Sequence, residues 1–361
     1  MVLQDFLIRR DDLSQTSWQE AQERPESPLE PGQARLRVDR FSLTANNITY
    51  ALLGDAMHYW NFFPAPEGWG RMPVWGYAEV VASTLPELRE GERVYGYLPP
   101  SPYLRVAPER LSARGFMDGS AHRRALAEVY QRYERVQPSP VDVEDRLALL
   151  RPLFGTGLLI DDWLHAQQLF GARQVVLSSA SSKTALGAAF MLSRRASREY
   201  QVVGLTSRRN RAFCERVGYY DRVLDYAELS KLAADVPTVT LDFAGNLQVL
   251  RDVHRHFAAA LRHSALIGLT HREATLQAPN EELPGPKPEL FFAPAHVQTG
   301  VKTWGPEGFA AHVAEGLGAF LTSTKAWLQI EHGKGQAAIE AAYRTIRDGQ
   351  LEPDRGLVLQ F

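Results

Sequence analysis

Short apolar runs separated by polar turns dominate residues 174–209. Gln174–Ser178 carries consecutive Val, Val and Leu residues that stop at a cluster of serines, which is typical of a buried strand. Thr184–Leu192 is almost entirely Ala, Leu, Gly, Phe and Met and predicts a helix packed closely on a sheet, and Gln201–Leu205 predicts the next strand. Such a unit is the βαβ crossover of a doubly wound sheet, whose first turn directs helix N-terminal amides at a phosphate.

Alternating apolar and polar positions predict strands in the first 110 residues. Ala34–Phe41 alternates after a Pro-Gly turn, and Val74–Ala82 and residues 88–96 read as two further strands around a turn. Tyr, Trp and Phe residues crowd positions 59–75 and indicate either a self-packed loop or a pocket wall. The pattern therefore predicts an α/β protein with a small β-rich domain preceding a doubly wound parallel sheet.

The first turn of the βαβ unit lacks the glycines of a dinucleotide fingerprint and reads SSASSKTA before the first glycine. Small side chains still allow close backbone approach, and hydroxyl and ammonium groups add donors for a phosphate. We therefore expect phosphate contacts from Ser181, Ser182, Lys183 and Thr184. Two alternatives are an ordinary serine-rich turn and a P-loop, although both glycines of a P-loop are missing.

The second turn follows the strand with Ser207, Arg208 and Arg209 and contains no carboxylate. An Asp or Glu there favours NAD, whereas an Arg accommodates the 2′-phosphate of NADP. The sequence therefore predicts NADP(H) as cofactor. The alternative is that both arginines are the solvated start of a helix.

Composition excludes several classes of protein. With 361 residues, 45% hydrophobic and 23% charged, the chain suits a soluble two-domain protein, and its net charge of −2 provides no footprint for nucleic acid. We expect no membrane span and no N-terminal signal, and hence a cytoplasmic protein. The single cysteine, Cys214, excludes an internal disulfide and predicts a buried, inert thiol, while His254, His256 and His263 are expected to be solvated rather than metal ligands.

A family resemblance rests on several sequence steps taken together. They are LEPG at 29–32, VDRFSLTANNITYALLG at 38–54, MPVWGYAEVV at 72–81, GERVYG at 91–96, VLDY at 223–226, LDFAG at 241–245 and the helix IEAAYR at 339–344. This succession resembles the medium-chain dehydrogenases/reductases, in particular their quinone reductase and enoyl reductase branch. It is also similar to the divergent subgroup known as DUF2855.

The resemblance implies two domains. A GroES-like catalytic domain would comprise residues 1–150 and 290–361, with a helical insertion at about 112–150, and a Rossmann domain would comprise 151–289. Within the insertion we expect Ser120–Arg135 to form a charged helix, a lid or an oligomer contact. The zinc ligands of the zinc-dependent members are absent from the sequence, so the resemblance implies a zinc-free enzyme, with a homodimer possible.

The resemblance also implies site residues. Tyr50 or Tyr59 would serve as proton donor or carbonyl anchor, Asn46 or Asn47 would orient an oxygen, and Tyr226, Ala244, Gly268 and Phe292 would join the cofactor contacts. These residues imply an NADPH-dependent reductase of an α,β-unsaturated carbonyl, enoyl thioester or quinone, with a small, apolar or acyl-like substrate. The alternative is a catalytically silent NADP(H)-binding sensor or scaffold with the same fold.

Overall fold

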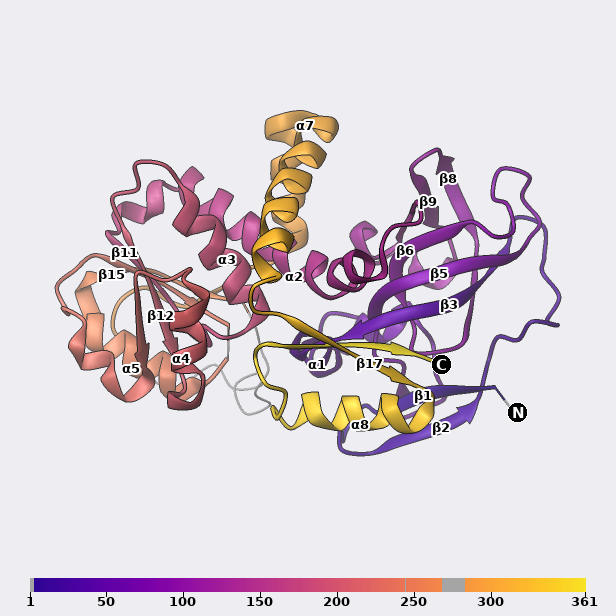
Figure 1. Cartoon of the computed structure of the whole chain (residues 1–361), viewed down its shortest axis with the longest axis horizontal. Coiled ribbons are helices and arrows are strands. Elements are labelled where there is room, and N and C mark those ends of the chain that lie inside the picture. Colours follow the sequence, from indigo (N-terminus) through magenta and orange to yellow (C-terminus); the bar gives the residue numbers. More distant parts are fainter. Residues whose placement is uncertain (1–2, 244, 268–282) are drawn as a thin grey trace. The chain divides into compact units, whose positions relative to one another are not determined.

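The computed structural model describes residues 3–243, 245–267 and 283–361, which form two compact units (Figure 1). Unit 1 comprises Met1–Leu149 and Gln329–Phe361, and unit 2 comprises Leu150–Leu328. None of the helices in these described ranges is long and apolar enough to cross a membrane.

Unit 1 is built on two sheets, one of order β2-β1-β4 and a larger one of order β17-β18-β3-β5-β6-β10-β9-β8, with β7 also paired to β3. The strands are β1 (Gln4–Arg9), β2 (Thr16–Glu20), β3 (Ala34–Leu43), β4 (Trp69–Gly70), β5 (Val74–Ser83), β6 (Arg93–Leu98), β7 (Tyr103–Val106), β8 (Pro108–Ser112), β9 (Gly115–Asp118), β10 (Arg132–Arg135), β17 (Gln329–Lys334) and β18 (Arg355–Gln360). The helical elements are α1 (Ala45–Leu52), η1 (Tyr59–Phe62), η2 (Ala121–Arg123), η3 (Glu128–Tyr130) and α8 (Gln336–Arg347). The strands predicted in the first 110 residues are thus confirmed.

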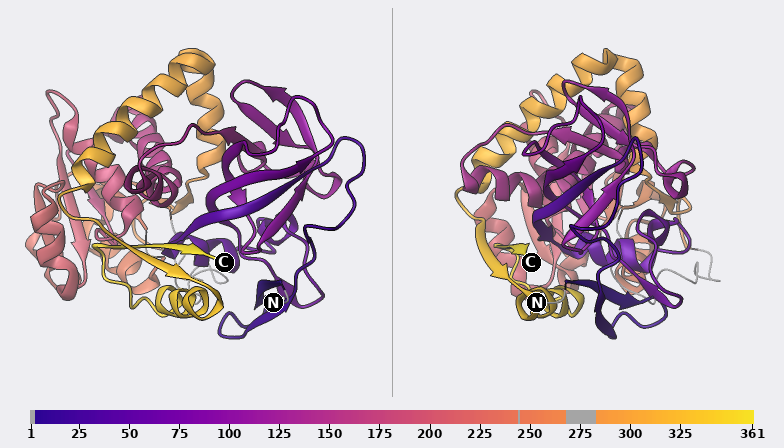
Figure 2. Two further views of the ribbon diagram at one scale, coloured as in Figure 1. Left: turned by 45° about the vertical axis from the view of Figure 1, so that its right-hand side comes forward. Right: turned by 90° about the vertical axis from the view of Figure 1, so that its right-hand side faces the viewer.

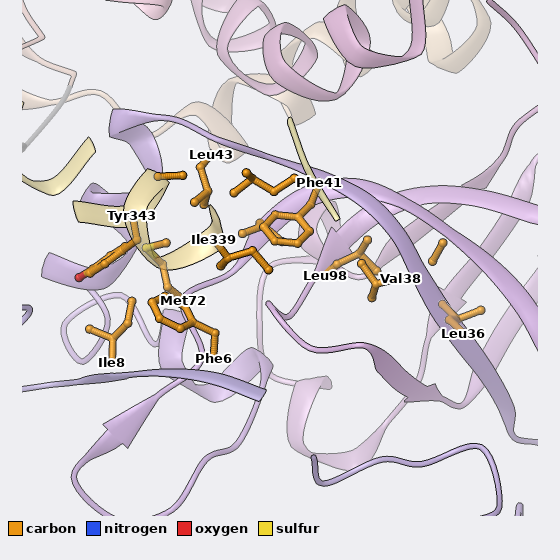
Figure 3. Packing of buried hydrophobic residues seen from close by; sticks show 14 of the residues in the cluster. Phe6, Ile8, Leu36, Val38, Phe41, Leu43, Met72, Leu98, Ile339 and Tyr343 are labelled. Carbon is orange, nitrogen blue, oxygen red and sulfur yellow. The ribbon is translucent and has the colours of Figure 1, made fainter. Parts of the chain in front are cut away.

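The core of unit 1 joins both ends of the chain (Figure 3). Phe41 on β3 is fully buried, and Ile339 and Tyr343 on α8 pack into the same cluster as Phe6 on β1. The phenol of Tyr343 donates a hydrogen bond to the Leu13 carbonyl at 2.7 Å. The C-terminal helix therefore holds the N-terminal hairpin onto the larger sheet.

The expected helix over Ser120–Arg135 is wrong, and so is the helical insertion before residue 140. This segment forms two single 3-10 turns, η2 and η3, and then strand β10. Tyr133 is buried, stacks on Phe116 at 5.2 Å between ring centroids and lies over Gly96, while its chain neighbours point outward. That alternation has the period of a strand, so pairing with β6 and β9 prevails over the helical spacing of the apolar residues.

Unit 2 contains a six-stranded sheet of order β13-β12-β11-β14-β15-β16 in which every neighbouring pair is parallel. Its strands are β11 (Gln174–Leu177), β12 (Gln201–Thr206), β13 (Arg222–Asp225), β14 (Thr238–Asp242), β15 (Leu261–Leu266) and β16 (Glu289–Leu290). Its helices are α2 (Val141–Ala166, shared with unit 1), η4 (Gln168–Gly171), α3 (Lys183–Arg194), α4 (Arg208–Val217), η5 (Tyr226–Lys231), α5 (Leu247–Phe257), η6 (Ala258–Ala260) and α7 (Ala293–Thr324). The predicted βαβ unit is β11-α3-β12.

Helix α7 is bent sharply, and Figure 2 shows two helical segments that meet at an angle. The backbone leaves helical geometry at Gly305, which is followed by Pro306. Residues 290–328 were expected in the first domain but belong to unit 2. The physical reason is aromatic packing, because Phe320 lies 5.0 Å from Phe154 on α2 and 5.2 Å from Phe190 on α3, measured between ring centroids.

Candidate functional site: a sheet edge in unit 2 and a tyrosine cluster in unit 1

The sheet of unit 2 changes direction between β11 and β14. From β11 the chain adds β12 and β13 on one side, and from β14 it adds β15 and β16 on the other. In open α/β sheets, ligands bind outside the carboxyl ends of the strands at such a switch point. The serine-rich turn after β11 and the end of β14 lie at this position.

The serine-rich turn is fixed to the neighbouring strand. The Ser178 hydroxyl donates to the Asp242 carboxylate at 2.5 Å and accepts from the Phe243 amide at 3.1 Å. Ser179 has a φ of +48°, a left-handed conformation that glycine adopts more easily. A serine therefore supplies the turn geometry for which dinucleotide folds use glycine.

Tyr226 contacts the backbone of this turn. Its phenol oxygen accepts a hydrogen bond from the Ser179 amide at 3.1 Å. Burial raises the pKa of Tyr226, so the phenol keeps its proton at neutral pH. The turn thus directs one backbone amide inward, toward a tyrosine that retains a hydroxyl proton to donate elsewhere.

Helix α3 begins directly after the turn. Ser182 is its N-cap, and the Ser182 hydroxyl accepts from the Ala185 amide at 3.3 Å. Lys183 and Thr184 are the first two helical residues, so their side chains lie at the positive end of the helix dipole. The four residues expected to contact phosphate are brought together at this end.

Ser181 is held by two residues from the end of β12 and the start of α4. Its hydroxyl oxygen accepts from the Asn210 side-chain amide at 2.9 Å and from the Thr206 hydroxyl at 3.5 Å. Sequence reasoning did not single out Asn210. The available signal was its position three residues after Ser207, in the first turn of the helix that follows the second phosphate-type turn.

Arg208 and Arg209 begin α4 after the N-cap Ser207. The Arg208 side chain is 92% exposed, and its Nε lies 3.8 Å from a carboxylate oxygen of Asp225 at the end of β13. Arg211, by contrast, is held by Glu215 and by Glu228 at 2.6 Å. Arg208 is therefore more exposed and less tightly paired than Arg211, which leaves its guanidinium able to meet an anion.

The remaining expected cofactor contacts have different outcomes. Phe292 is the N-cap of α7, directly after β16, and is 36% exposed, while the amide of the buried Phe291 donates to the Leu266 carbonyl at 2.9 Å. Phe292 thus lies at a strand end of the same sheet. Ala244 and Gly268 lie outside the residues that the structure describes.

The two candidate catalytic tyrosines lie together in unit 1. The rings of Tyr50 and Tyr59 are 4.8 Å apart between centroids, and the Tyr50 phenol accepts from the Trp75 indole at 3.2 Å. The Tyr59 and Tyr130 phenol oxygens are 3.4 Å apart. Burial raises the pKa of both Tyr50 and Tyr59, so both phenols are protonated donors at neutral pH.

Tyr130 belongs to the segment that sequence reasoning treated as a helix, and it was not recognised as part of the site. Its ring lies 4.7 Å from that of Tyr97, which is fully buried in the same cluster. The four phenols of this tyrosine cluster are thus Tyr50, Tyr59, Tyr97 and Tyr130. Only the long-range fold brings Tyr130 to the others.

The two asparagines differ in their partners. Asn47 is 3% exposed and caps α1, since its side-chain oxygen accepts from the Thr44 amide at 2.7 Å and its side-chain amide donates to the Pro73 carbonyl at 2.8 Å. Asn46 is half-buried, and its side chain opposes the rise in the pKa of the Tyr50 phenol that burial causes. Asn46 therefore influences a candidate catalytic residue, whereas Asn47 is bound to Thr44 and to the Pro73 carbonyl.

The cysteine and histidines also have defined environments. Cys214 is buried as predicted, and burial raises its pKa to about 12, which leaves the thiol protonated and unreactive. The prediction that the three histidines are solvated is wrong for His254 and His263, which are buried, and the His254 ring contacts the Pro284 carbonyl at 2.9 Å and the Ser264 hydroxyl at 2.8 Å. In the described ranges, no group of three or more His, Cys, Asp or Glu residues is placed to hold a metal ion.

Comparison with known proteins adds a family and a fold. The model of a family described as "Protein of unknown function (DUF2855)" matches residues 41–352. No match is found among curated proteins. Among solved structures, the chain is similar to CurA from Vibrio vulnificus in complex with NADPH, at 14% identity and a TM-score of 0.65, over 99% of this chain and 98% of that one.

Two further structures have the same architecture. The CurK enoyl reductase is 14% identical with a TM-score of 0.56, over 100% of both chains. A putative NADPH:quinone reductase from Mesorhizobium loti is 12% identical with a TM-score of 0.60, over 99% of this chain and 98% of that one. These similarities confirm the predicted fold class, a β-rich domain with a Rossmann-type parallel sheet.

Proposed function

The chain belongs to the DUF2855 family, and from its fold and its sheet edge we propose that it is an NADP(H)-dependent, zinc-independent reductase. The observation that carries the proposal is the carboxyl edge of the parallel sheet in unit 2. There the serine-rich turn, the positive end of α3 and the exposed guanidinium of Arg208 lie at the ends of adjacent strands. A dinucleotide with a 2′-phosphate needs hydrogen-bond donors or positive charge at both strand ends, one set for the pyrophosphate and one for the 2′-phosphate.

The proposed contacts follow the order of the turns. Ser181, Ser182, Lys183 and Thr184 bind the pyrophosphate, and Arg208 binds the 2′-phosphate. Asp225 stands on the neighbouring strand but already lies 3.8 Å from Arg208 and caps η5 by accepting from the Ala227 amide at 3.0 Å. The similarity to CurA, which was crystallised with NADPH, supports this choice of cofactor.

The proposed chemistry in unit 1 uses the tyrosine cluster. NADPH held by Ser181, Ser182, Lys183, Thr184 and Arg208 would supply a hydride for the β-carbon of an α,β-unsaturated carbonyl compound, which would place negative charge on the carbonyl oxygen. A protonated phenol of Tyr50 or Tyr59 would donate a hydrogen bond to that oxygen, and a proton from this donor or from water would then be taken up at the α-carbon to give the saturated carbonyl compound. The Trp75 indole, which donates to the Tyr50 phenol oxygen at 3.2 Å, orients Tyr50.

The proposed substrates are small enones, enoyl thioesters or quinones. The aromatic residues of the cluster favour a flat or apolar molecule. An enoyl reductase and a putative quinone reductase among the similar structures support these two classes equally. The homodimer and the cytoplasmic location stay predictions.

The decisive experiment is a fluorescence titration of the purified protein with NADPH and NADH. We expect micromolar binding of NADPH, weaker binding of NADH, and roughly tenfold weaker NADPH binding in Arg208→Ala, equivalent to about 1.4 kcal/mol. Arg216→Ala, an exposed arginine at the other end of α4, is the matched control and should bind like the wild type. If neither nucleotide binds, the reductase proposal fails.

A second experiment tests the chemistry. NADPH oxidation is followed with a panel of enones, enoyl thioesters and quinones in the wild type, Tyr50→Phe and Tyr59→Phe. Loss of turnover with intact NADPH binding supports the assigned phenols, and full activity in both variants removes those assignments. The silent sensor is favoured instead if the wild type binds NADPH but oxidises it with no substrate.

A further inference from the structure

The hydrogen-bond polarity around Ser181 is set by its neighbours. A serine hydroxyl has two lone pairs and one hydrogen, whereas an amide nitrogen of asparagine can only donate. The Ser181 oxygen accepts from the Asn210 side-chain nitrogen at 2.9 Å and from the Thr206 hydroxyl at 3.5 Å. Its own hydrogen is therefore directed away from both, and no acceptor for it is recorded among the described residues.

We propose that Asn210 is a positioning residue that keeps the Ser181 hydroxyl a donor toward the pyrophosphate of the bound nucleotide. The inference rests on the proposed function. Phosphate oxygens only accept hydrogen bonds, so a hydroxyl that rotated to present a lone pair would repel them. Asn210 prevents that rotation by occupying the lone-pair side of Ser181.

The need for such a residue follows from the turn itself. In a glycine-rich turn, backbone amides point at the phosphates and have a fixed polarity. Here the Ser179 amide is directed to Tyr226, so side-chain hydroxyls replace an amide donor. A hydroxyl can donate or accept, and its direction must be set by a neighbour.

The position of Asn210 suits this role. It is half-buried in the first turn of α4, and its own amide donates to the Ser207 carbonyl at 2.9 Å, which fixes the backbone from which the side chain reaches Ser181. An aspartate of the same shape would accept the Ser181 proton instead of donating to the oxygen. Asparagine and aspartate at position 210 thus have the same shape but differ in charge and in the direction of the hydrogen bond with Ser181.

A double-mutant cycle with NADPH as the titrated ligand tests the proposal. The proteins are the wild type, Asn210→Leu, Ser181→Ala and the double variant, with Asn210→Asp as a second substitution if leucine disturbs folding. We expect each single substitution to weaken NADPH binding about fivefold, equivalent to about 1 kcal/mol. The double variant should bind no more weakly than Ser181→Ala alone, because Asn210 acts through Ser181.

A fragment supplies the second readout. 2′-AMP lacks the pyrophosphate, so its affinity should be the same in the wild type and in Asn210→Leu, whereas a general disturbance of α4 would weaken both ligands. Asn210→Asp also adds a negative charge, which can weaken NADPH binding by itself. For this variant, only the loss of NADPH affinity that is absent when Ser181 is already alanine supports the proposal.

Three outcomes are distinguishable. Absence of NADPH binding in the wild type overturns the proposed function itself. Normal binding in the wild type and in Asn210→Leu overturns only the role of Asn210. Independent, multiplying losses in the double variant also overturn it, because Asn210 would then act without Ser181.

Discussion

Two glycines on α2 should respond in opposite ways to the same substitution. Gly155 and Gly157 both lie in the helix, with no positive φ at either position. A Cβ at Gly155 would meet nothing within 4 Å, whereas a Cβ at Gly157 would lie 2.5 Å from the Ala188 amide nitrogen and 2.7 Å from the Gly187 carbonyl carbon. Gly157 therefore marks the place where α2 and the backbone of α3 touch.

The magnitudes follow from two effects. Replacing a helical glycine by alanine stabilises a helix by about 1 kcal/mol, and Gly155→Ala should gain that amount. Overpacking costs about 1–3 kcal/mol, and the overlap at Gly157 is with backbone, which cannot rotate away, so we expect the upper value there. Gly157→Ala should then lose about 2 kcal/mol net, and the two unfolding midpoints should differ by roughly 6–12 °C.

Thermal and urea unfolding, followed by circular dichroism, measure this difference. The consequence extends to function, because α3 begins at the serine-rich turn and a displaced α3 moves Ser182 and Lys183. Gly157→Ala should therefore also weaken NADPH binding, while Gly155→Ala leaves it unchanged. An unfolding midpoint of Gly157→Ala at or above that of the wild type would refute the close packing of α2 on α3.

Three further predictions use single side chains. Ser179→Gly removes a left-handed serine and should raise the free energy of unfolding by up to about 1 kcal/mol, measured in urea, with NADPH binding retained. Asp118→Ala leaves the buried guanidinium of Arg123 without its carboxylate and should cost about 3–5 kcal/mol in the same assay, a loss that an unchanged urea midpoint would contradict. Burial lowers the pKa of His254 below its ordinary value of 6.5, so the unfolded chain binds a proton that the folded chain excludes, and stability should fall as pH drops below that value. His254→Gln should flatten this dependence in a pH series of unfolding curves without abolishing it, because the pKa values of His263 and His296 are lowered too.

The sequence predicted the βαβ unit well because both faces of a central parallel strand are buried. Such a strand reads as an uninterrupted apolar run, and β11 and β12 do so. The serine cluster that ends the first run also contains the N-cap of α3, Ser182, whose hydroxyl accepts from a helix amide. Local sequence was sufficient here because local groups determine the conformation.

The local sequence pattern did not predict the structure of residues 120–135, because residues distant along the chain determine it. The apolar positions allow helical spacing, but Gly96 leaves room for Tyr133, and the buried Arg123 donates a hydrogen bond to the Phe62 carbonyl at 3.0 Å. Neither partner can be identified by its distance along the chain. The burial of His254 against Pro284 and Ser264 escaped prediction for the same reason.

The serine-rich turn shows how a nucleotide site can persist without its glycine fingerprint. Glycine contributes turn geometry and room for the ligand, while its amide contributes a donor of fixed direction. In this chain Ser179 adopts the left-handed geometry and small side chains leave room for the ligand. The Ser179 amide donates to Tyr226, so side-chain hydroxyls replace it as donors. A hydroxyl, however, lacks a fixed direction, so the donor function comes to depend on a residue outside the turn. Asn210, 29 positions after Ser181, fills that requirement. A sequence motif that covers only the turn would therefore miss Asn210, the residue that sets the direction of the Ser181 hydroxyl.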